Sequence, residues 1–479
     1  MPLLEAMLKY KRDAVYPFHT PGHKGGRGME ATLKQQVGSD ALMLDVSLMS
    51  ELDDIHAPRS YLAQAQQLAA RLYGSDKTFF AVNGTTQAVH TMLMTACRPG
   101  DKVLIPRNAH RCVAGGLLLG DLCPVYVLPE FDTEYGINTQ VTPATIAEAL
   151  KRDKDITAVL LTSPNYYGQT ADVQAIADIA HEHGAVLLVD EAHGAHLGFG
   201  PLVPPSALQC GADAAAQSTH KLLGALTQCS MLHVKGERLD LERAAYVMSL
   251  LTTTSPNYLL MASLDAARCQ FALLGSQMIE SAVAAAEHLR EIAWEFEDLR
   301  LLDVGCIGKN GVFGFDKTKV TINFRRWGIS GAQAAASLRE LGIAVELADA
   351  ANVLFLVTYA DVRKDYELAL HRIKHVLENL REYRQARTEA PLDFRLPQAE
   401  VVLPPRVAFD APGEAIALTD AVGRICAEQV SFYPPGIPVL LPGELITEQA
   451  VDYCQKMLAK GLPVSGPADV LLHKLRVVK

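Results

Sequence analysis

The sequence predicts an α/β fold built on a mostly parallel sheet. Short apolar runs of strand length alternate with segments whose apolar residues recur at helical spacing, as in sheets whose strands are joined by helical crossovers. The run at 185–189, Ala-Val-Leu-Leu-Val, is the clearest buried strand, and the helical segment before it ends at Gly184, a favoured C-terminal residue. Thr142 and Pro143 are a typical helix start. At 479 residues the chain is expected to hold two to four domains.

Composition and charge exclude several classes of protein. Hydrophobic residues make up 49% of the chain and charged residues 20%, which indicates a folded chain and not a disordered one. A net charge of −10 argues against nucleic acid or an anionic membrane as the main partner. The cysteines form no C-x-x-C pair, so neither a disulfide framework nor a zinc ribbon is expected. With no signal peptide and no apolar stretch of bilayer length, the expected location is the cytoplasm.

The first 60 residues are expected to form an arm. Residues 1–10 have the spacing of a short amphipathic helix, and the segment 17–26 is too rich in Gly and Pro for regular structure. His19 and His23 lie in this constrained loop. Two interpretations stay open: the loop faces a ligand, or it is an ordered turn at a subunit contact.

An Asn-Gly-Thr-Thr turn joins a strand at 78–82 to a helix at 87–96, and this arrangement suits an anion. Backbone N–H groups and the helix dipole point at a bound phosphate, and threonine hydroxyls add donors. The turn is not a Walker loop, because the G-K-[ST] ending is missing. Since threonine also caps many helices that bind nothing, Gly84, Thr85 and Thr86 indicate a phosphate site only together with other features.

Two polar side chains follow strand ends elsewhere in the chain. The strand at 102–106 leads to His110, and the strand at 185–189 leads to Asp190. The carboxyl ends of strands are where ligands bind in open α/β sheets. A lone histidine in such a place is more often a polar surface residue, so His110 indicates a ligand site only together with the other candidate residues.

Lys221 lies in Gln-Ser-Thr-His-Lys, between a run of alanines and two leucines, so its surroundings are expected to be buried. Most lysines are solvated surface charges, and a buried one is costly unless it is paired or neutralised. Desolvation and neighbouring charge lower the pKa of a lysine, and the free amine can then attack a carbonyl to form a Schiff base.

The second half of the chain is expected to hold smaller domains. A long Ala-rich helical stretch at 259–299 is the usual bridge to a second domain, and 300–380 alternates strands, one of them at 344–347, with helices. The tail has repeated Pro-Gly turns and one helix. The predicted division is an arm at 1–60, a large domain at 61–258, a small domain at 259–385 and a C-terminal domain at 386–479.

Two histidine pairs raise the question of a metal. His181 and His183 lie at a helix end with no third ligand nearby, and His193 and His196 lack the spacing of an H-E-x-x-H helix. No metal site is therefore expected.

Taken together, these segments match the needs of pyridoxal phosphate (PLP). The phosphate suits the helix N-terminus at Thr85 and Thr86, and the aldehyde suits Lys221. The pyridine nitrogen works as an electron sink only when protonated, and a buried carboxylate such as Asp190 keeps it so by ion pairing. The imidazole of His110 can lie flat on the ring.

Five segments resemble the bacterial Orn/Lys/Arg decarboxylases with the aspartate-aminotransferase fold, and the resemblance covers about residues 10–470. They are Asp-Glu-Ala-His at 190–193, Ser-Thr-His-Lys at 218–221, His-Thr-Pro-Gly-His-Lys at 19–24, Thr-Thr-Ser-Pro at 253–256 and Tyr-Pro-Pro-Gly at 433–436. The resemblance implies PLP-dependent fold type I with a smaller α/β domain and a C-terminal α+β domain. It also implies a homodimer whose active sites lie at the subunit interface.

The resemblance also implies roles for single residues. Ala192 is the small residue packed under the ring, Glu346 is a candidate for binding the distal cation of the substrate, and the residue that protonates Cα stays open among Lys221, His193 and an arm residue. The implied catalytic residues are Lys221, Asp190, His110 and His193; the cofactor-binding residues are Gly84, Thr85, Thr86, His110, Asp190, Ala192, Ser218, His220 and Lys221; the substrate-binding residues are Glu346, His19 and His23.

The implied reaction is the decarboxylation of a small basic amino acid. The chain starts almost at the arm, like short, biosynthetic-type members that lack an N-terminal wing domain, so we favour arginine to agmatine in polyamine biosynthesis. Lysine and ornithine are cations of similar shape and stay open. An aminotransferase on the same fold, with Arg325, Arg326 or Arg363 as a carboxylate clamp, and a non-catalytic protein that kept the fold also stay open.

Overall fold

The computed structural model describes residues 1–49, 51–362, 364–384, 394–433 and 436–479. The chain forms two compact units. Unit 1 comprises Met1–Ala96, Leu188–His196 and Ala207–Gly275, and unit 2 comprises Cys97–Leu187, Leu197–Ser206 and Ser276–Lys479. Arg363, the two prolines of the Tyr-Pro-Pro-Gly segment and the predicted boundary at 385/386 lie outside the described residues.

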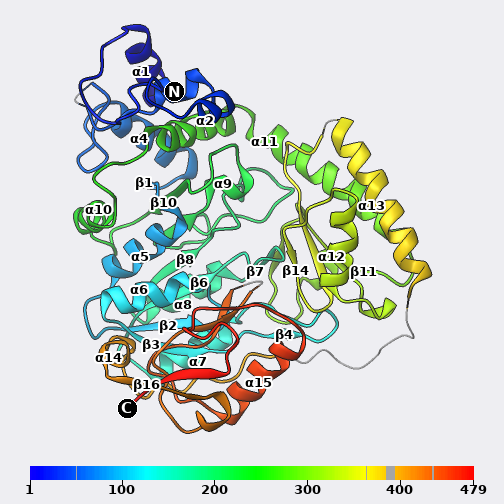
Figure 1. Ribbon diagram of the computed structural model, residues 1–479. Coiled ribbons are helices and arrows are strands. Elements are labelled where there is room, and N and C mark those ends of the chain that lie inside the picture. Colours follow the sequence, from blue (N-terminus) through cyan, green and yellow to red (C-terminus); the bar gives the residue numbers. More distant parts are fainter. Residues whose placement is uncertain (50, 363, 385–393, 434–435) are drawn as a thin grey trace. The chain divides into compact units, whose positions relative to one another are not determined.

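Unit 1 contains the arm and part of a sheet, with strands in the order β1-β10-β9-β8 (Figure 1). β8 and β9 are parallel, and β10 is antiparallel to both of its neighbours. Helix α5 packs against β9 and β10, and α10 packs on α5. The elements are α1 (Pro2–Arg12), α2 (Ala31–Val37), α3 (Ser39–Leu44), α4 (Tyr61–Tyr73), β1 (Lys77–Ala81), α5 (Gly84–Ala96), β8 (Val186–Asp190, which starts in unit 2), β9 (Ala214–Gln217), α9 (Thr219–Leu222), β10 (Ser230–Val234), α10 (Leu241–Leu250) and α11 (Tyr258–Trp294, which ends in unit 2).

Burial explains why these strands form. Every residue of β8, β9 and β10 is buried, as expected for strands that are covered on both faces. The arm is held to the unit by α1, whose Leu3 and Met7 are buried and whose Leu3 N–H donates to Asp265 Oδ2 on α11 at 3.0 Å. The arm is therefore an ordered part of unit 1.

Unit 2 contains a parallel sheet β6-β2-β3, an antiparallel sheet β11-β13-β15-β14 and small sheets in the C-terminal segment. Its first elements are β2 (Lys102–Pro106), α6 (Cys112–Gly120), β3 (Cys123–Val127), β4 (Phe131–Asp132), β5 (Ile137–Asn138), α7 (Pro143–Arg152), β6 (Ile156–Thr162), β7 (Gln169–Thr170) and α8 (Val173–Glu182). The others are β11 (Arg300–Leu302), β12 (Gly314–Phe315), β13 (Lys319–Asn323), α12 (Gly331–Glu340), β14 (Leu347–Ala348), β15 (Asn352–Leu356), α13 (Lys364–Glu382), α14 (Pro405–Asp410), β16 (Gly413–Ala417), β17 (Val430–Phe432), β18 (Ile437–Leu440), α15 (Glu448–Ala459), β19 (Val464–Ser465) and β20 (Lys474–Val478).

Clusters of buried apolar residues stabilise unit 2, and two of them mark its later segments. One lies between residues 285 and 380, where apolar residues of α12 and α13 pack with β13 and β15. Helices α12 and α13 contact each other (Figure 1). The other cluster lies between residues 418 and 477 in the C-terminal segment. The predicted four-part division follows other boundaries than the two units, since the large domain at 61–258 has residues in both, and it stays a prediction.

The helix predictions with strong end signals are confirmed. Thr142 caps α7 by accepting a hydrogen bond from the N–H of Thr145, and Pro143 is its first residue. The strand predicted at 344–347 is wrong at its first three residues, because β14 begins at Leu347 and has two residues. So short a strand exists only through its pairing with β15, and no local pattern encodes that pairing. None of the described helices is long and apolar enough to cross a membrane.

Candidate active site

Three of the residues predicted to hold a phosphate, Gly84, Thr85 and Thr86, lie at the N-terminus of α5 in unit 1. This helix begins at Gly84, which has φ +72°, so Thr85 and Thr86 lie in its first turn and not in the preceding loop as predicted. Within the described part of the chain, the N–H groups of Thr85 and Thr86 donate no hydrogen bond. N–H groups in the first turn of a helix have no partner inside the helix and suit an anion.

Three hydroxyl groups gather at this helix end. Thr85 Oγ1 is hydrogen-bonded to Ser218 Oγ, and it also lies 2.8 Å from Ser230 Oγ. All three side chains are buried. Thr85 and Ser218 were predicted, but Ser230 was missed. A serine at the start of a fully buried strand was the available signal, and only the pairing of β1 with β10 brings it to the site.

Lys221 lies in α9, the short helix that follows β9. Its Nζ is 2.9 Å from Nε2 of His193, a residue that is 4% exposed. The structure therefore brings together two residues that the sequence places 28 positions apart. A proton can pass between the amine and the imidazole at this distance.

Asp190 ends β8 and is 2% exposed. Its Oδ1 accepts a hydrogen bond from the N–H of Ala192 at 3.2 Å. Burial raises the pKa of Asp190, and the charge of Lys221 and the bond from Ala192 oppose this shift. A buried carboxylate of this kind gains from a cation at hydrogen-bond distance, which is what a protonated pyridine nitrogen offers.

His220 is oriented by a main-chain carbonyl. Its Nδ1 lies 2.7 Å from the oxygen of Cys229, and since a carbonyl only accepts, Nδ1 carries the proton. Burial lowers the pKa of His220, and the nearby charge of Lys221 lowers it further. To donate to a phosphate through Nε2 as well, the ring must hold both protons, which a bound anion favours.

Two predicted residues belong to unit 2. His110 follows β2, and its Nδ1 accepts a hydrogen bond from the N–H of Cys112 at 3.3 Å. Glu346 is exposed on the bend before β14, and its N–H donates to Leu354 O at 3.0 Å. The stacking role of His110 and the substrate role of Glu346 stay predictions.

The two arm histidines are hydrogen-bonded inside the arm. His19 Nε2 lies 2.8 Å from the hydroxyl of Tyr10, and His23 Nε2 lies 3.0 Å from Asp45 Oδ2. His23 Nδ1 also accepts from the N–H of Gly26 at 3.0 Å. These contacts order the loop, and they are compatible both with a ligand-facing loop and with a turn at a subunit contact.

The residues of unit 1 fit PLP. The first turn of α5 and the hydroxyl cluster suit the phosphate, Lys221 suits the aldehyde, and Asp190 suits the ring nitrogen. Among the described residues, no group of three or more His, Cys, Asp or Glu side chains forms a metal-ligand cluster. These residues therefore predict that PLP reacts here with the amine of a substrate.

Two family models match the chain. The model described as Orn/Lys/Arg decarboxylase, major domain, matches residues 1–365, and the model described as Orn/Lys/Arg decarboxylase, C-terminal domain, matches residues 398–462. An arginine decarboxylase of Bacillus anthracis is 39% identical over 483 residues, which cover 100% of this chain and 97% of the relative. An arginine decarboxylase of Bacillus subtilis (strain 168) is 39% identical over 480 residues, with 100% and 98% coverage.

Solved structures agree on the fold. A crystal structure of a Francisella novicida lysine decarboxylase superimposes with a TM-score of 0.84 at 22% identity, and it covers 100% of this chain and 81% of that chain. The predicted PLP-dependent fold type I is therefore confirmed. The chain belongs to the Orn/Lys/Arg decarboxylase family of PLP-dependent amino-acid decarboxylases.

Proposed function

We propose that this chain binds PLP and decarboxylates arginine to agmatine. The observation that carries the proposal is the pairing of Lys221 Nζ with His193 Nε2 at 2.9 Å in the unit that also buries Asp190. The preference for arginine is supported by the curated Bacillus relatives, which are named arginine decarboxylase at 39% identity over the full chain. Agmatine formation suits polyamine biosynthesis in the cytoplasm.

When bound, PLP supplies the electron sink that stabilises the carbanion left at Cα by loss of CO2. Asp190 holds a proton at the ring nitrogen, and its burial strengthens that ion pair. Thr85, Thr86, Ser218 and His220 hold the phosphate. These residues fix the position of the substrate amine relative to Lys221, so that the bond to be broken is aligned before reaction.

Lys221 and His193 form the proton-handling pair. A proton that leaves the substrate amine can rest on either residue, because the two nitrogens lie within hydrogen-bond distance. The same pair can return a proton to Cα after CO2 has left. His193 is buried, which keeps bulk water from competing for that step.

We also infer that the chain acts as a homodimer with its sites at the subunit interface. Tyr16 and Phe18 of the arm are 63% and 92% exposed, and such apolar exposure favours burial against a partner. Residues 253–255, in the Thr-Thr-Ser-Pro segment, are also exposed. Light scattering of the purified chain measures the mass of the particle in solution, and we expect the mass of a dimer. The mass of a monomer at all concentrations would contradict the inference.

The test is release of CO2 and amine from purified, PLP-loaded protein given arginine, lysine and ornithine separately. We expect arginine to be consumed fastest and Lys221→Ala protein, folded by circular dichroism, to release no CO2. Preference for lysine or ornithine would correct the substrate. Amino-group transfer to a 2-oxo acid without CO2 release would replace decarboxylation with transamination.

A further inference from the structure

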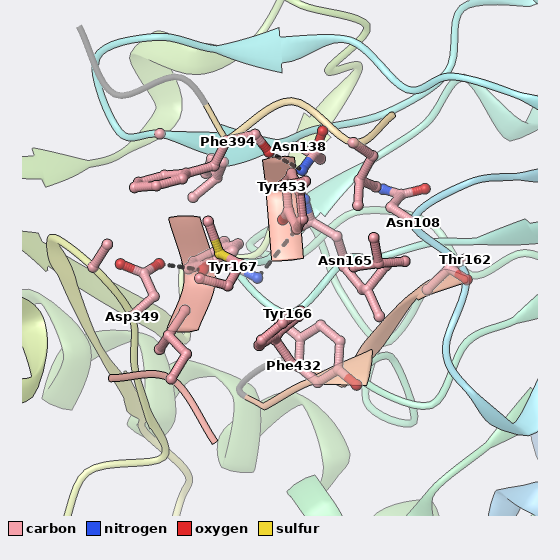
Figure 2. A pocket seen from close by; sticks show the side chains of 18 residues that line it. Asn108, Asn138, Thr162, Asn165, Tyr166, Tyr167, Asp349, Phe394, Phe432 and Tyr453 are labelled. Atoms are coloured by element: carbon pink, nitrogen blue, oxygen red, sulfur yellow. Dashed lines mark hydrogen bonds between the residues drawn. The ribbon is translucent and has the colours of Figure 1, made fainter. Parts of the chain in front are cut away.

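Unit 2 contains a pocket lined by eighteen described residues (Figure 2). They come from the ends of β2 and β6, from β5, from the loop after β14 and from the C-terminal segment. The pocket encloses about 90 Å³. Since one water needs roughly 10–15 Å³ of such volume, there is room for a chain of roughly six to nine non-hydrogen atoms.

Among these eighteen described residues, only Asp349 carries a formal charge. Its Oδ2 accepts a hydrogen bond from the hydroxyl of Tyr167 at 2.6 Å and another from Asn352 Nδ2 at 2.9 Å. Burial raises the pKa of Asp349, and these hydrogen bonds oppose the shift. The lining supplies the carboxylate with donors but with no cation, so a cationic ligand would gain from its charge.

Aromatic rings form much of the wall. In the view of Figure 2, Asp349 lies on one side of the pocket, Asn108 and Thr162 lie on the other, and most of the labelled rings appear between them. The electron-rich faces of such rings attract ammonium and guanidinium groups. The five aromatic lining residues are Tyr166, Tyr167, Phe394, Phe432 and Tyr453.

The polar atoms of the wall include acceptors that a cation can use. Thr162 Oγ1 is buried and forms no hydrogen bond within the described part of the chain. Asn108 and Asn138 each donate their Nδ2 to a main-chain oxygen, of Thr139 at 2.9 Å and of Phe394 at 3.4 Å. The side-chain oxygen of each residue has two lone pairs that can accept from a ligand, and each amide also keeps a second N–H.

We propose that this pocket binds an aliphatic amine or guanidine cation, with a charged group near Asp349 and its methylene chain among the rings. The same chemistry is offered by the cationic end of a basic substrate and by a free diamine or agmatine. The proposal concerns unit 2 alone. Binding of a cation can be measured without turnover, and only the choice between the two sources, made through KM, rests on the proposed function.

Calorimetric titration of the full, PLP-loaded chain tests the proposal. The probes are 1,4-diaminobutane and agmatine, with 1,4-butanediol as an uncharged probe of similar length. We expect both cations to bind and the diol not to bind. Asp349→Asn, which keeps the side-chain size, should raise the Kd for the cations at least about tenfold, as for loss of a charge-assisted contact.

Asp361→Asn is the matched control. Asp361 Oδ2 also accepts from a loop, from the N–H of Thr358 at 2.8 Å, but Asp361 does not line the pocket. Its replacement should leave the Kd unchanged. If Asp349→Asn protein does not fold, Tyr453→Leu and Tyr453→Phe replace it: loss of the ring should weaken binding several-fold more than loss of the hydroxyl.

Each outcome either supports or overturns the proposal. Equal affinity for the diol, an unchanged Kd in Asp349→Asn protein, or equal weakening by Asp361→Asn would overturn it. If Asp349→Asn raises the KM for arginine by the same factor as the Kd for the diamine, the pocket takes the cationic end of the substrate. If KM is unchanged while diamine binding is lost, the pocket takes a free amine.

Discussion

Replacing Thr85 with valine is expected to weaken PLP binding without unfolding the protein. Valine keeps the shape of threonine and removes only the hydroxyl. In the structure that hydroxyl is hydrogen-bonded to Ser218 and lies 2.8 Å from Ser230 Oγ, at the N-terminus of α5. In the proposed phosphate site, the substitution removes one donor to the phosphate, and it also removes the hydroxyl that contacts both serines.

The expected magnitude follows from these contacts. A hydrogen bond to a charged group contributes roughly 1.5–3 kcal/mol, which corresponds to a rise of roughly 10- to 150-fold in the Kd for PLP. The hydroxyls of Ser218 and Ser230 also lose a buried partner, at a cost of roughly 1–3 kcal/mol each in stability if they find no other. Thr85→Val protein should therefore be less stable but still folded.

Thr91→Val is the control, because Thr91 is also buried on the same helix and its hydroxyl contacts Met248 Sδ at 3.5 Å, away from the N-terminus. The assay is titration of apoprotein with PLP, followed by absorbance. The ratio of the two Kd values isolates the phosphate contact from general loosening of α5. A Thr85→Val protein that binds PLP as tightly as Thr91→Val protein would refute the proposed phosphate role.

Buried groups give three further predictions. Asp190→Ala should lower kcat by orders of magnitude with PLP still bound, because the ring nitrogen loses its counter-charge; a rate within about tenfold, roughly 1.4 kcal/mol of barrier, would count against that role. Burial raises the pKa of Glu191 to about 8 from 4.5, so the folded chain keeps a proton that the unfolded chain releases in this range. This stabilisation is complete below about pH 4.5 and is lost as pH rises to about 8. Urea unfolding should show that the wild-type chain loses at most roughly 5 kcal/mol of stability through Glu191 between pH 4.5 and 8, and that Glu191→Gln protein lacks this loss; equal losses in both proteins would contradict the assignment. Gly331→Ala should destabilise unit 2 by roughly 1–3 kcal/mol, since its Cβ would lie 2.1 Å from Asn352 O, and thermal unfolding should show no such loss for Gly22→Ala, whose Cβ meets nothing within 4 Å.

Local sequence patterns predicted the helices that have clear capping residues and the strands that are fully buried. The helix signal that ends at Gly184 corresponds to α8, whose cap is Asp172, and the apolar run before Asp190 corresponds to β8. These predictions succeed because a capping side chain and an apolar run act within a few residues of sequence. The helix after the Asn-Gly-Thr-Thr turn was predicted three residues too late, since its first turn has no apolar periodicity and begins at a glycine with positive φ.

The sequence by itself determined the fold class, the family and the identity of the residues expected to hold PLP, because these depend on local patterns and on motifs such as Ser-Thr-His-Lys. Only the tertiary structure decided which of these residues meet. Thr85 and Ser230 are 145 positions apart, and they touch because β10 lies antiparallel to β1 under α5. Likewise, the carboxylate of Asp349 meets Tyr167 across 182 positions to line a pocket that no single segment encodes. Strand order and loop packing set these distances through long-range burial, which local sequence does not specify.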